Sequence, residues 1–254
     1  MQWLSFMYEE SREKSGKGGV DFPSFEAFWE AGIAEAKGEE REPVMLAKFR
    51  VDPAANPLKT PSGKIEIFSE KIASFGYDDC PGHAVWLEPA EWLGSKKAER
   101  FPLHMLSDQP GDKLHSQLDH SPHAKSTKVK GRQPITLHPD DARARGVGEG
   151  DLVRVFNDRG ACLAAARLSD RLRRSVVRLS TGAWFDPEDA GSNRPLEKHG
   201  NPNALTLDIG ASKLSQGCIA QTCLVEIERY DGPAPAVTAH DLPKFHKASR
   251  PAAF

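Results

Sequence analysis

The sequence predicts a mainly β protein with short helices, in which the part from about residue 100 onward closes into a compact barrel of six or seven strands. The first observation behind this fold class is the density of turn formers, since 19 prolines and 21 glycines in 254 residues favour short strands over long helices. The second is the order of elements after Phe101, where strand-like runs, one short helix and a hairpin turn follow one another at close spacing.

The segment from residue 1 to about residue 40 is expected to be helical. Four large apolar side chains recur at spacings of three, one and four, as one face of a helix requires: Phe25, Phe28, Trp29 and Ile33. Ser15 to Gly19 is predicted to be a flexible loop within this segment. Aromatic side chains this close to the beginning of a chain rarely stay exposed on a free domain, so we expect the segment to pack on other protein.

Two strands and a short helix are expected between this helical segment and residue 100. Pro43 to Arg50 has the composition of a strand, and the alternation of Ile65 and Ile67 with charged residues after Pro61 indicates a second strand. Ser69 to Phe75 is expected to form one or two helical turns. An α/β segment is therefore predicted to precede the barrel.

The barrel strands are predicted from short runs of strand-forming residues. The runs are Leu103 to Leu106, Ile135 to Leu137, Leu152 to Phe156, Ala161 to Leu168 and Val176 to Leu179. His138 to Gly146 is predicted to be a short helix, since Pro139 suits its first turn and Gly146 suits its C-terminal cap. Asn157 to Gly160 is a hairpin-type turn.

A polar loop follows the first of these strands and is the strongest candidate binding feature. Ser107-Asp-Gln-Pro-Gly111 breaks the strand, and Leu-His-Ser-Gln ends the loop at Gln117. Serine, glutamine and histidine side chains beside a Pro-Gly turn suit a large polar ligand with phosphates and ring edges. An ordinary polar surface loop is the alternative.

The composition argues against several function classes. The net charge is −2 and 39% of the residues are hydrophobic, so no basic excess indicates a nucleic-acid partner, and no apolar run is long enough to span a membrane. The first residues have neither the basic nor the apolar stretch of an export signal. Four cysteines without CxxC spacing favour free thiols in a reducing compartment over zinc or disulfides. These observations predict a cytoplasmic protein.

One long motif carries a family resemblance. His-Pro-x-Asp-Ala-x-x-x-Gly-Val-x-x-Gly-Asp-x-Val-x-Val-x-Asn-x-Arg-Gly, from His138 to Gly160, resembles the C-terminal molybdopterin-dinucleotide-binding domain of the dimethyl sulfoxide reductase family, a double-psi β-barrel. The Leu-His-Ser-Gln loop, Gly200 to Asn203 and Gln216 to Thr222 resemble the branch of S-oxide and N-oxide reductases. With the segment that begins at Pro61, they are most similar to the biotin sulfoxide reductases of that branch. The resemblance covers almost the whole chain.

The resemblance implies a molybdenum enzyme that reduces an S-oxide, either biotin sulfoxide or methionine sulfoxide, by oxygen-atom transfer. The implied cofactor is bis(molybdopterin guanine dinucleotide) molybdenum. In this branch a serine ligates the metal, and that serine belongs to an earlier part of a much longer chain. We therefore expect neither a catalytic nor a metal-ligating residue here. An upstream twin-arginine signal would indicate the periplasm rather than the cytoplasm.

The implied partners are the remaining N-terminal domains of the parent enzyme, a small S-oxide or N-oxide substrate and an electron donor of unknown identity. Three regions are expected. Residues 1–99 would be a remnant of the preceding catalytic-body domains, residues 100–232 the barrel, and residues 233–254 an extended C-terminal tail rich in proline and alanine.

The resemblance also assigns cofactor contacts to three loops. The residues are Ser107, Gln109, His115, Ser116 and Gln117 in the first loop, Asn201 and Asn203 in the second, and Gln216, Gly217, Ala220, Gln221 and Thr222 in the third. Related enzymes have Ser-Pro-His-Pro where this chain has Ser-Asp-Gln-Pro, so Asp108 and Gln109 depart from the family pattern. We expect the loops to meet at one end of the barrel, because a large buried ligand needs a partner for each polar edge.

Other interpretations of these residues stay open. His115, His120 and His123 suggest a metal site, although their spacing fits no compact zinc pattern. Lys113 and Arg132 are candidates for phosphate contacts, with solvated side chains as the favoured alternative. For the whole chain, the alternatives are a fragment of a trimethylamine N-oxide or dimethyl sulfoxide reductase and a non-catalytic cofactor-binding module.

Overall fold

The structure is a computed structural model that describes residues 1–36 and 42–242. The chain divides into two compact units, residues 1–66 and residues 67–254. Within the described residues, no helix has the length and apolar character that a membrane span requires.

The described elements of the first unit are α1 (Gln2–Lys17), α2 (Phe25–Ala31) and α3 (Ala47–Val51). Aromatic rings join α1 to α2, with Tyr8 stacked on Phe28 at a centroid distance of 4.7 Å. The predicted helical segment is confirmed for α1 and α2, and its last part, from residue 37, lies outside the described residues. α1 continues into the expected loop and ends at Lys17. α2 ends before Ile33 because Gly32 adopts a left-handed φ of 71°.

The two strands predicted before residue 100 are wrong. α3 lies within the first, and no strand forms around Ile65 and Ile67, which are 67% and 88% exposed and have no apolar surface to alternate against. The short helix predicted after Ser69 is confirmed as α4 (Glu70–Ala73), and η1 (Lys96–Glu99) precedes the barrel. The described elements of this expected α/β segment are therefore all helices.

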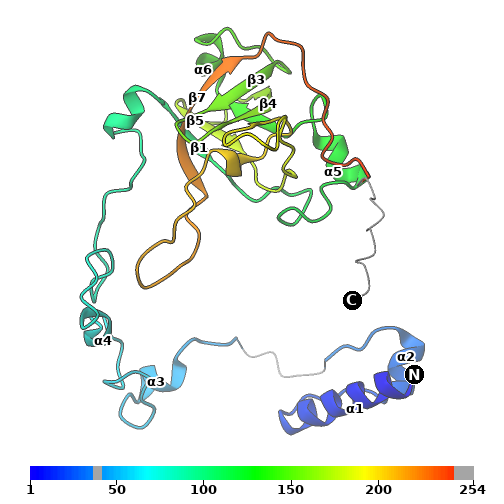
Figure 1. The fold of residues 1–254 in the computed structure, drawn as a ribbon. Coiled ribbons are helices and arrows are strands. Elements are labelled where there is room, and N and C mark those ends of the chain that lie inside the picture. Colours follow the sequence, from blue (N-terminus) through cyan, green and yellow to red (C-terminus); the bar gives the residue numbers. More distant parts are fainter. Residues whose placement is uncertain (37–41, 243–254) are drawn as a thin grey trace, which may run out of the picture. The chain divides into compact units, whose positions relative to one another are not determined.

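The second unit contains a seven-stranded sheet. Its strands are β1 (Leu103–Leu106), β2 (Pro134–Leu137), β3 (Leu152–Phe156), β4 (Ala161–Leu168), β5 (Val176–Leu179), β6 (Leu196–Glu197) and β7 (Thr222–Arg229). In the order β2-β5-β1-β7-β3-β4, the pairing of β4 with β2 closes six strands into a barrel, and β6 pairs with β4 outside it (Figure 1). β1 is parallel to β5 and β2 is parallel to β4. The barrel is a double-psi β-barrel, as predicted.

Short helices lie in the connections between these strands: α5 (Pro122–Thr127), α6 (Pro139–Arg143) and η2 (Pro202–Ala204). α6 confirms the helix predicted after His138, whose Nδ1 caps it by accepting the Asp140 N–H at 3.1 Å. The predicted hairpin is confirmed between β3 and β4, where the Asn157 N–H donates to the Gly160 carbonyl at 3.0 Å. Alternate side chains of the strands, among them Met105, form the fully buried core.

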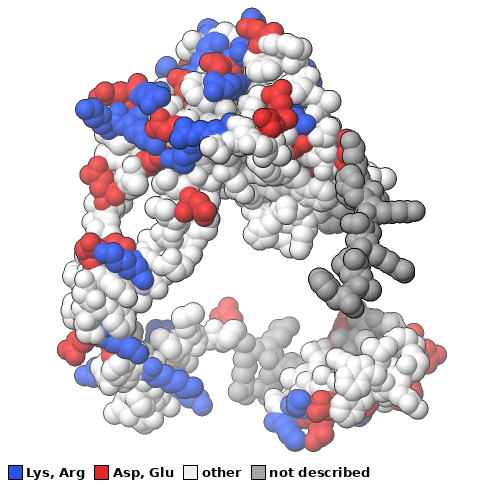
Figure 2. Space-filling view, viewed as in Figure 1, with Lys and Arg blue, Asp and Glu red and all other residues white. Residues whose placement is uncertain are grey.

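The outer surface of the barrel beside η1 carries both signs of charge. Figure 2 shows Lys and Arg side chains gathered over this part of the barrel with acidic side chains among them. Lys97 and Arg100 lie 3.6 and 2.8 Å from Asp158 carboxylate oxygens. Exposed ion pairs of this kind contribute less than about 1 kcal/mol each, so they stabilise the attachment of η1 only weakly.

A buried carboxylate makes the stronger connection between the segment before β1 and the barrel. Glu91 accepts two hydrogen bonds from the Arg159 guanidinium, at 2.7 and 3.0 Å, one from Lys97 Nζ and one from the Leu224 N–H at 2.9 Å. Burial alone would raise the pKa of Glu91, but these donors outweigh it and lower the pKa to about 2. The carboxylate is therefore ionised throughout the neutral range.

Replacing Glu91 with glutamine should lower the free energy of unfolding at neutral pH by about 2–3 kcal/mol, because Arg159 and Lys97 lose their charged partner. The pKa of Glu91 is lowered in the folded state, so its stabilising contribution is present above the unfolded value near 4.5 and is lost as the pH falls toward 2. Urea unfolding across this pH range should show the two proteins converging in stability. Glu99→Gln, at an exposed carboxylate, is the control, and a constant difference between Glu91→Gln and the unsubstituted protein would contradict this assignment.

Candidate functional site

The first two predicted loops and the end of the third, at Gln221 and Thr222, lie at one end of the barrel. The register pairs Leu106 of β1 with Thr222 of β7, and Ile135 of β2 with Leu179 of β5. The ends of β1, β3 and β5 and the starts of β2, β4 and β7 therefore form one rim, here called the loop rim. The second predicted loop joins this rim because the His199 carbonyl accepts the N–H of Gln133, the residue before β2, at 3.0 Å.

The first and third loops are in direct contact. Ser107 is buried at the end of β1, and its N–H donates to the Gln221 carbonyl at 2.8 Å. This bond continues the pairing of β1 with β7 by one residue. Gln109 is exposed, and its side-chain amide donates to the Lys113 carbonyl at 3.1 Å, so part of its hydrogen-bonding capacity shapes the loop itself.

His115, Ser116 and Gln117 form an exposed turn on the loop rim. The Gln117 N–H donates to the Leu114 carbonyl at 2.9 Å, and His115 adopts a left-handed φ of 51°. Trp184 Nε1 donates to the Ser116 carbonyl at 2.7 Å from the segment that follows β5. The turn is thus fixed through its backbone, while its three polar side chains face outward.

A buried glutamate organises the second loop. Glu197 accepts the N–H groups of His199 at 3.0 Å and of Gly200 and Asn201 at 2.7 Å. Burial raises the pKa of Glu197 to about 7, while these N–H donors favour its ionised form. Asn201 is buried, and its side-chain oxygen caps η2 by accepting the Asn203 N–H at 2.9 Å. Asn203 itself is exposed.

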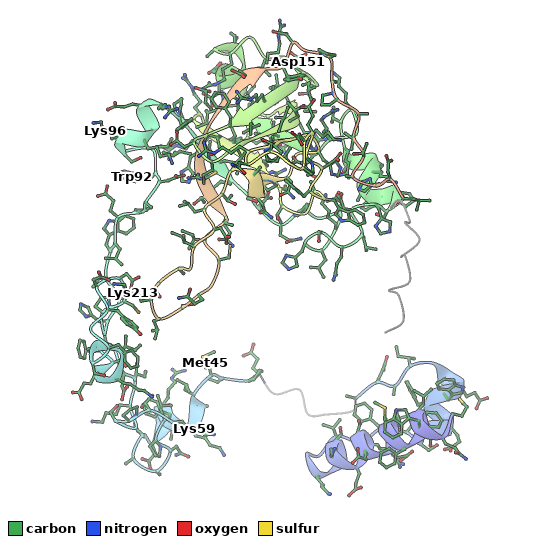
Figure 3. All side chains as sticks on the ribbon, in the orientation of Figure 1. Met45, Lys59, Trp92, Lys96, Asp151 and Lys213 are labelled. Carbon is green, nitrogen blue, oxygen red and sulfur yellow. The ribbon has the colours of Figure 1, made fainter. Side chains whose placement is uncertain are left out.

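The third loop is only partly at the rim. Gln221 and Thr222 are exposed at the start of β7, with Ala220 half-buried beside them. Gln216 and Gly217 instead lie on the long excursion between η2 and β7, where the Gln216 side chain donates to the Ser212 carbonyl at 3.1 Å. Lys213 at its tip lies near the segment that carries α4, 2.7 Å from Asp78 (Figure 3). The structure therefore does not bring Gln216 and Gly217 together with Ser107.

Two cavities flank the predicted loops. One, of about 400 Å³, is lined by Gln109 of the first loop together with Arg167 and Arg178. The other, of about 380 Å³, is lined by Asn201 and Asn203 of the second loop together with Arg159 and Arg194. The four arginines were not predicted as site residues. Guanidinium groups recognise phosphates through paired hydrogen bonds, so three of these arginines suit a phosphate-bearing ligand, whereas Arg159 already donates to Glu91 and to the Leu205 carbonyl.

The loop rim also holds a buried charge cluster that the sequence interpretation missed. Asp119 is fully buried, and its carboxylate lies 2.8 Å from Lys128 Nζ, 3.3 Å from Lys113 Nζ and 2.9 Å from His240 Nε2. The favoured prediction that Lys113 and Arg132 are solvated is wrong, because both are buried. His240 joins Asp119 from 121 residues away, so no local pattern indicated this member of the cluster.

The same cluster contains a possible set of metal ligands. Among the described residues, ligand atoms of Asp119, His199 and His240 lie within 4.8 Å of one another. The ammonium groups of Lys113 and Lys128 already neutralise the Asp119 carboxylate and would repel a cation, so the geometry favours an ion-pair cluster over a metal centre. The histidines considered from sequence, at positions 115, 120 and 123, are not members of this set.

Protonation states in the cluster follow from burial and partners. Burial alone would raise the pKa of Asp119, but hydrogen bonds from Lys128 and His240 hold that pKa well below its usual range. Burial lowers the pKa of His199 to about 4, so its ring is neutral at pH 7. The Trp184 carbonyl lies 2.9 Å from His199 Nδ1, which must therefore carry the proton.

A close backbone approach sets the position of the first loop. Gly182, after β5, has a φ of +99°, and a Cβ there would overlap the His115 carbonyl. Gly182→Ala should therefore destabilise the fold by about 1–3 kcal/mol more than Gly150→Ala. The control shares the left-handed strain of about 1–2 kcal/mol, since Gly150 has a φ of +75° and open space around it. Chemical denaturation of both variants measures the difference, and equal losses would refute the close approach.

Comparisons with known proteins agree with this architecture. Residues 103–224 match the family described as "Molydopterin dinucleotide binding domain". Acetylene hydratase from Pelobacter acetylenicus shares the fold with a TM-score of 0.57 at 20% sequence identity, over 70% of this chain and 25% of that chain.

Curated relatives are similar over nearly the whole chain. A dimethyl sulfoxide/trimethylamine N-oxide reductase of Rhodobacter capsulatus is 43% identical over 96% of this chain and 30% of its own length. A biotin sulfoxide reductase of Cereibacter sphaeroides is 47% identical over 92% and 31%, and a trimethylamine-N-oxide reductase of Salmonella typhimurium is 45% identical over 96% and 29%. The chain thus spans less than a third of the length of these relatives. Together with the closed barrel, these similarities show that the chain belongs to the dimethyl sulfoxide reductase family and carries its dinucleotide-binding barrel.

Proposed function

We propose that the loop rim binds part of a bis(molybdopterin guanine dinucleotide) molybdenum cofactor, and that the chain is the cofactor-binding portion of an enzyme that reduces an S-oxide such as biotin or methionine sulfoxide. The observation that carries this proposal is the arrangement of the rim, where residues of the first and second loops line cavities that contain arginines, and Gln221 of the third loop pairs with Ser107. The similarity to S-oxide and N-oxide reductases supports the choice of reaction.

The residues at the rim fit such a group. His115, Ser116, Gln117, Asn203 and Gln221 are exposed, and their neutral donors and acceptors match the edges of pterin and guanine rings. Arg167, Arg178 and Arg194 supply positive charge for the phosphates, whereas Arg159 is already paired with Glu91. Ser107 and Asn201, both buried, would act mainly by shaping the loops, and Thr222 and Ala220 lie beside Gln221. Gln216 and Gly217 would contribute only if their excursion folds back toward the rim.

When bound, the cofactor supplies the oxygen-atom transfer chemistry, which these side chains do not themselves perform. The role of the barrel would be to orient the cofactor and to exclude water from the cofactor's polar edges. The metal-ligating serine and the substrate cavity would belong to the remaining domains of the parent enzyme. An electron donor of unknown identity completes the reaction.

Each of the three predicted regions of the chain is assigned a role within the parent enzyme. Residues 1–99 would pack against the catalytic-body domains, in keeping with the exposure of Trp3 and Phe6, which are 68% and 54% exposed. Residues 100–232 would form the cofactor-binding unit, followed by the predicted tail, of which residues 243–254 lie outside the described residues. The buried thiols of Cys162 and Cys223 are free, which supports a reducing compartment, the cytoplasm. A trimethylamine N-oxide or dimethyl sulfoxide substrate is the second candidate, because relatives named for those activities are almost as similar.

In the longer reductase that contains this barrel, Asn203→Ala and Gln221→Ala should each reduce cofactor occupancy. Each change leaves a buried ring edge of the bound cofactor without a partner, at a cost of about 1–3 kcal/mol. The fold should survive, because both side chains lie outside the apolar core. Molybdenum content per folded molecule is the measurement. His123→Ala, at an exposed histidine of α5, is the control, and unchanged occupancy in both rim variants would contradict the assignment.

The 254-residue chain by itself should show no turnover. It lacks the proposed metal-ligating serine and the part of the cavity that would exclude water from the metal. The test supplies purified chain with extracted cofactor, a reduced dye and biotin sulfoxide, and follows dye oxidation. Molybdenum-dependent turnover by this chain would overturn the division of labour proposed here. In the longer enzyme, a higher kcat/KM for trimethylamine N-oxide than for biotin sulfoxide would select the second substrate class.

A further inference from the structure

The chain returns to the loop rim after β7. Residues 235–240, here called the C-terminal strap, are fixed at several points. The Arg132 guanidinium donates to the Pro235 carbonyl. The buried Asp186 carboxylate accepts the Thr238 hydroxyl and N–H at 2.7 Å each and the Ala239 N–H at 3.0 Å. These bonds place the end of the strap, His240, at a defined position on the rim.

His240 contacts the centre of the buried charge cluster. Its Nε2 lies 2.9 Å from Asp119 Oδ2, and since the Asp119 carboxylate is ionised, His240 is the donor. The His240 ring also lies edge-on to the rings of Trp184, at 5.3 Å, and of His199, at 5.0 Å. The imidazole is therefore held on three sides, by one carboxylate and two rings.

The contact continues from Asp119 to the proposed cofactor loop. Asp119 Oδ2, the oxygen that His240 contacts, also accepts the Trp184 N–H at 3.3 Å. The Trp184 indole then donates to the Ser116 carbonyl at 2.7 Å. His240 is thus connected through Asp119 and Trp184 to the turn that presents His115 and Gln117.

That turn needs external support. His115 and Leu118 both adopt left-handed backbone conformations, with φ of 51° and 66°. Such conformations cost a residue with a side chain roughly 1–2 kcal/mol each and persist only where the surroundings impose them. Supports of the turn include the Trp184 indole and Asp119, and both of these contact His240. Asp119 is itself also held by Lys113 and Lys128.

We propose that His240 is a positioning residue: the C-terminal strap holds the Asp119 carboxylate and the Trp184 indole so that the turn from Leu114 to Leu118 keeps its strained conformation. The link to cofactor binding rests on the proposed function, whereas the positioning of the turn does not. His240 touches no reacting group and acts only through Asp119 and Trp184. Its loss should loosen the turn and leave the barrel strands intact.

Amide hydrogen exchange of the 254-residue chain without cofactor tests this, followed by mass spectrometry on peptides that cover residues 112–120 and the barrel strands. In His240→Ala, exchange of the Gln117 amide, which donates to Leu114, should be at least tenfold faster than in the unsubstituted chain. His240→Gln should retain slow exchange, because a glutamine amide can replace the imidazole N–H as donor to Asp119. His123→Ala is the control for losing an exposed histidine near the same loop.

Several results would overturn the proposal. One is unchanged amide exchange around Gln117 in His240→Ala. A second is an equal acceleration of exchange in β1 and β7, which would indicate a general stabilising role for His240. The third is fast exchange around Gln117 in His240→Gln. Since no cofactor is present, none of these results depends on the function proposed for the rim. Failure of that function would appear separately, as unchanged molybdenum content in the loop variants.

Discussion

The parallel pairing of β2 with β4 is the constraint on which the rest of this structure depends. It runs from Pro134 opposite Ala165 to Leu137 opposite Leu168 and joins the two ends of the strand order. Closure removes the free strand edges that an open sheet would leave among the six barrel strands. It also fixes which strand ends lie together. Strand order and register therefore place loops that are separated by most of the barrel sequence beside one another, whether or not the loops contact each other.

The loop rim carries several buried polar and charged side chains. Asp119, Glu197, Lys113 and His199 are all buried there, and each is balanced by an opposite charge, by backbone N–H groups or by a neutral protonation state. Buried ion pairs add little net stability compared with apolar packing, but leaving one member unpaired is costly. The network therefore permits few alternative arrangements, which suits a surface that must present several loops in one geometry.

The barrel could largely be predicted from the sequence because its signals are local. The cap at His138 and the hairpin turn at Asn157 each depend on a few adjacent residues. β7 was missed although the alternation of Val225 and Ile227 with glutamates was readable, and its inward residues are buried in the core. The strand expected around Ile65 failed for the opposite reason, since alternation without a neighbouring strand has nothing to pair with.

The same distinction between local and long-range signals applies to the candidate site. The three loops were found through family resemblance, and their common rim follows from strand register, which local patterns do not encode. The charge cluster was not predicted, because Asp119 and His240 are 121 residues apart and a lone buried aspartate has no sequence signature. Likewise, the arginines that line the two cavities stand in strand and turn segments where a solvated charge is the ordinary expectation.

The place of β7 in the strand order has a consequence for biosynthesis. β7 is the last of the described strands, yet it pairs with β1, the first of them, on one side and with β3 on the other. A ribosome that has delivered everything up to η2 has produced five of the six barrel strands, but β1 and β3 still lack their common neighbour. Their exposed edges are a hazard for association with other nascent chains. The barrel can close only after Arg229 has left the exit tunnel and β7 can pair with both neighbours.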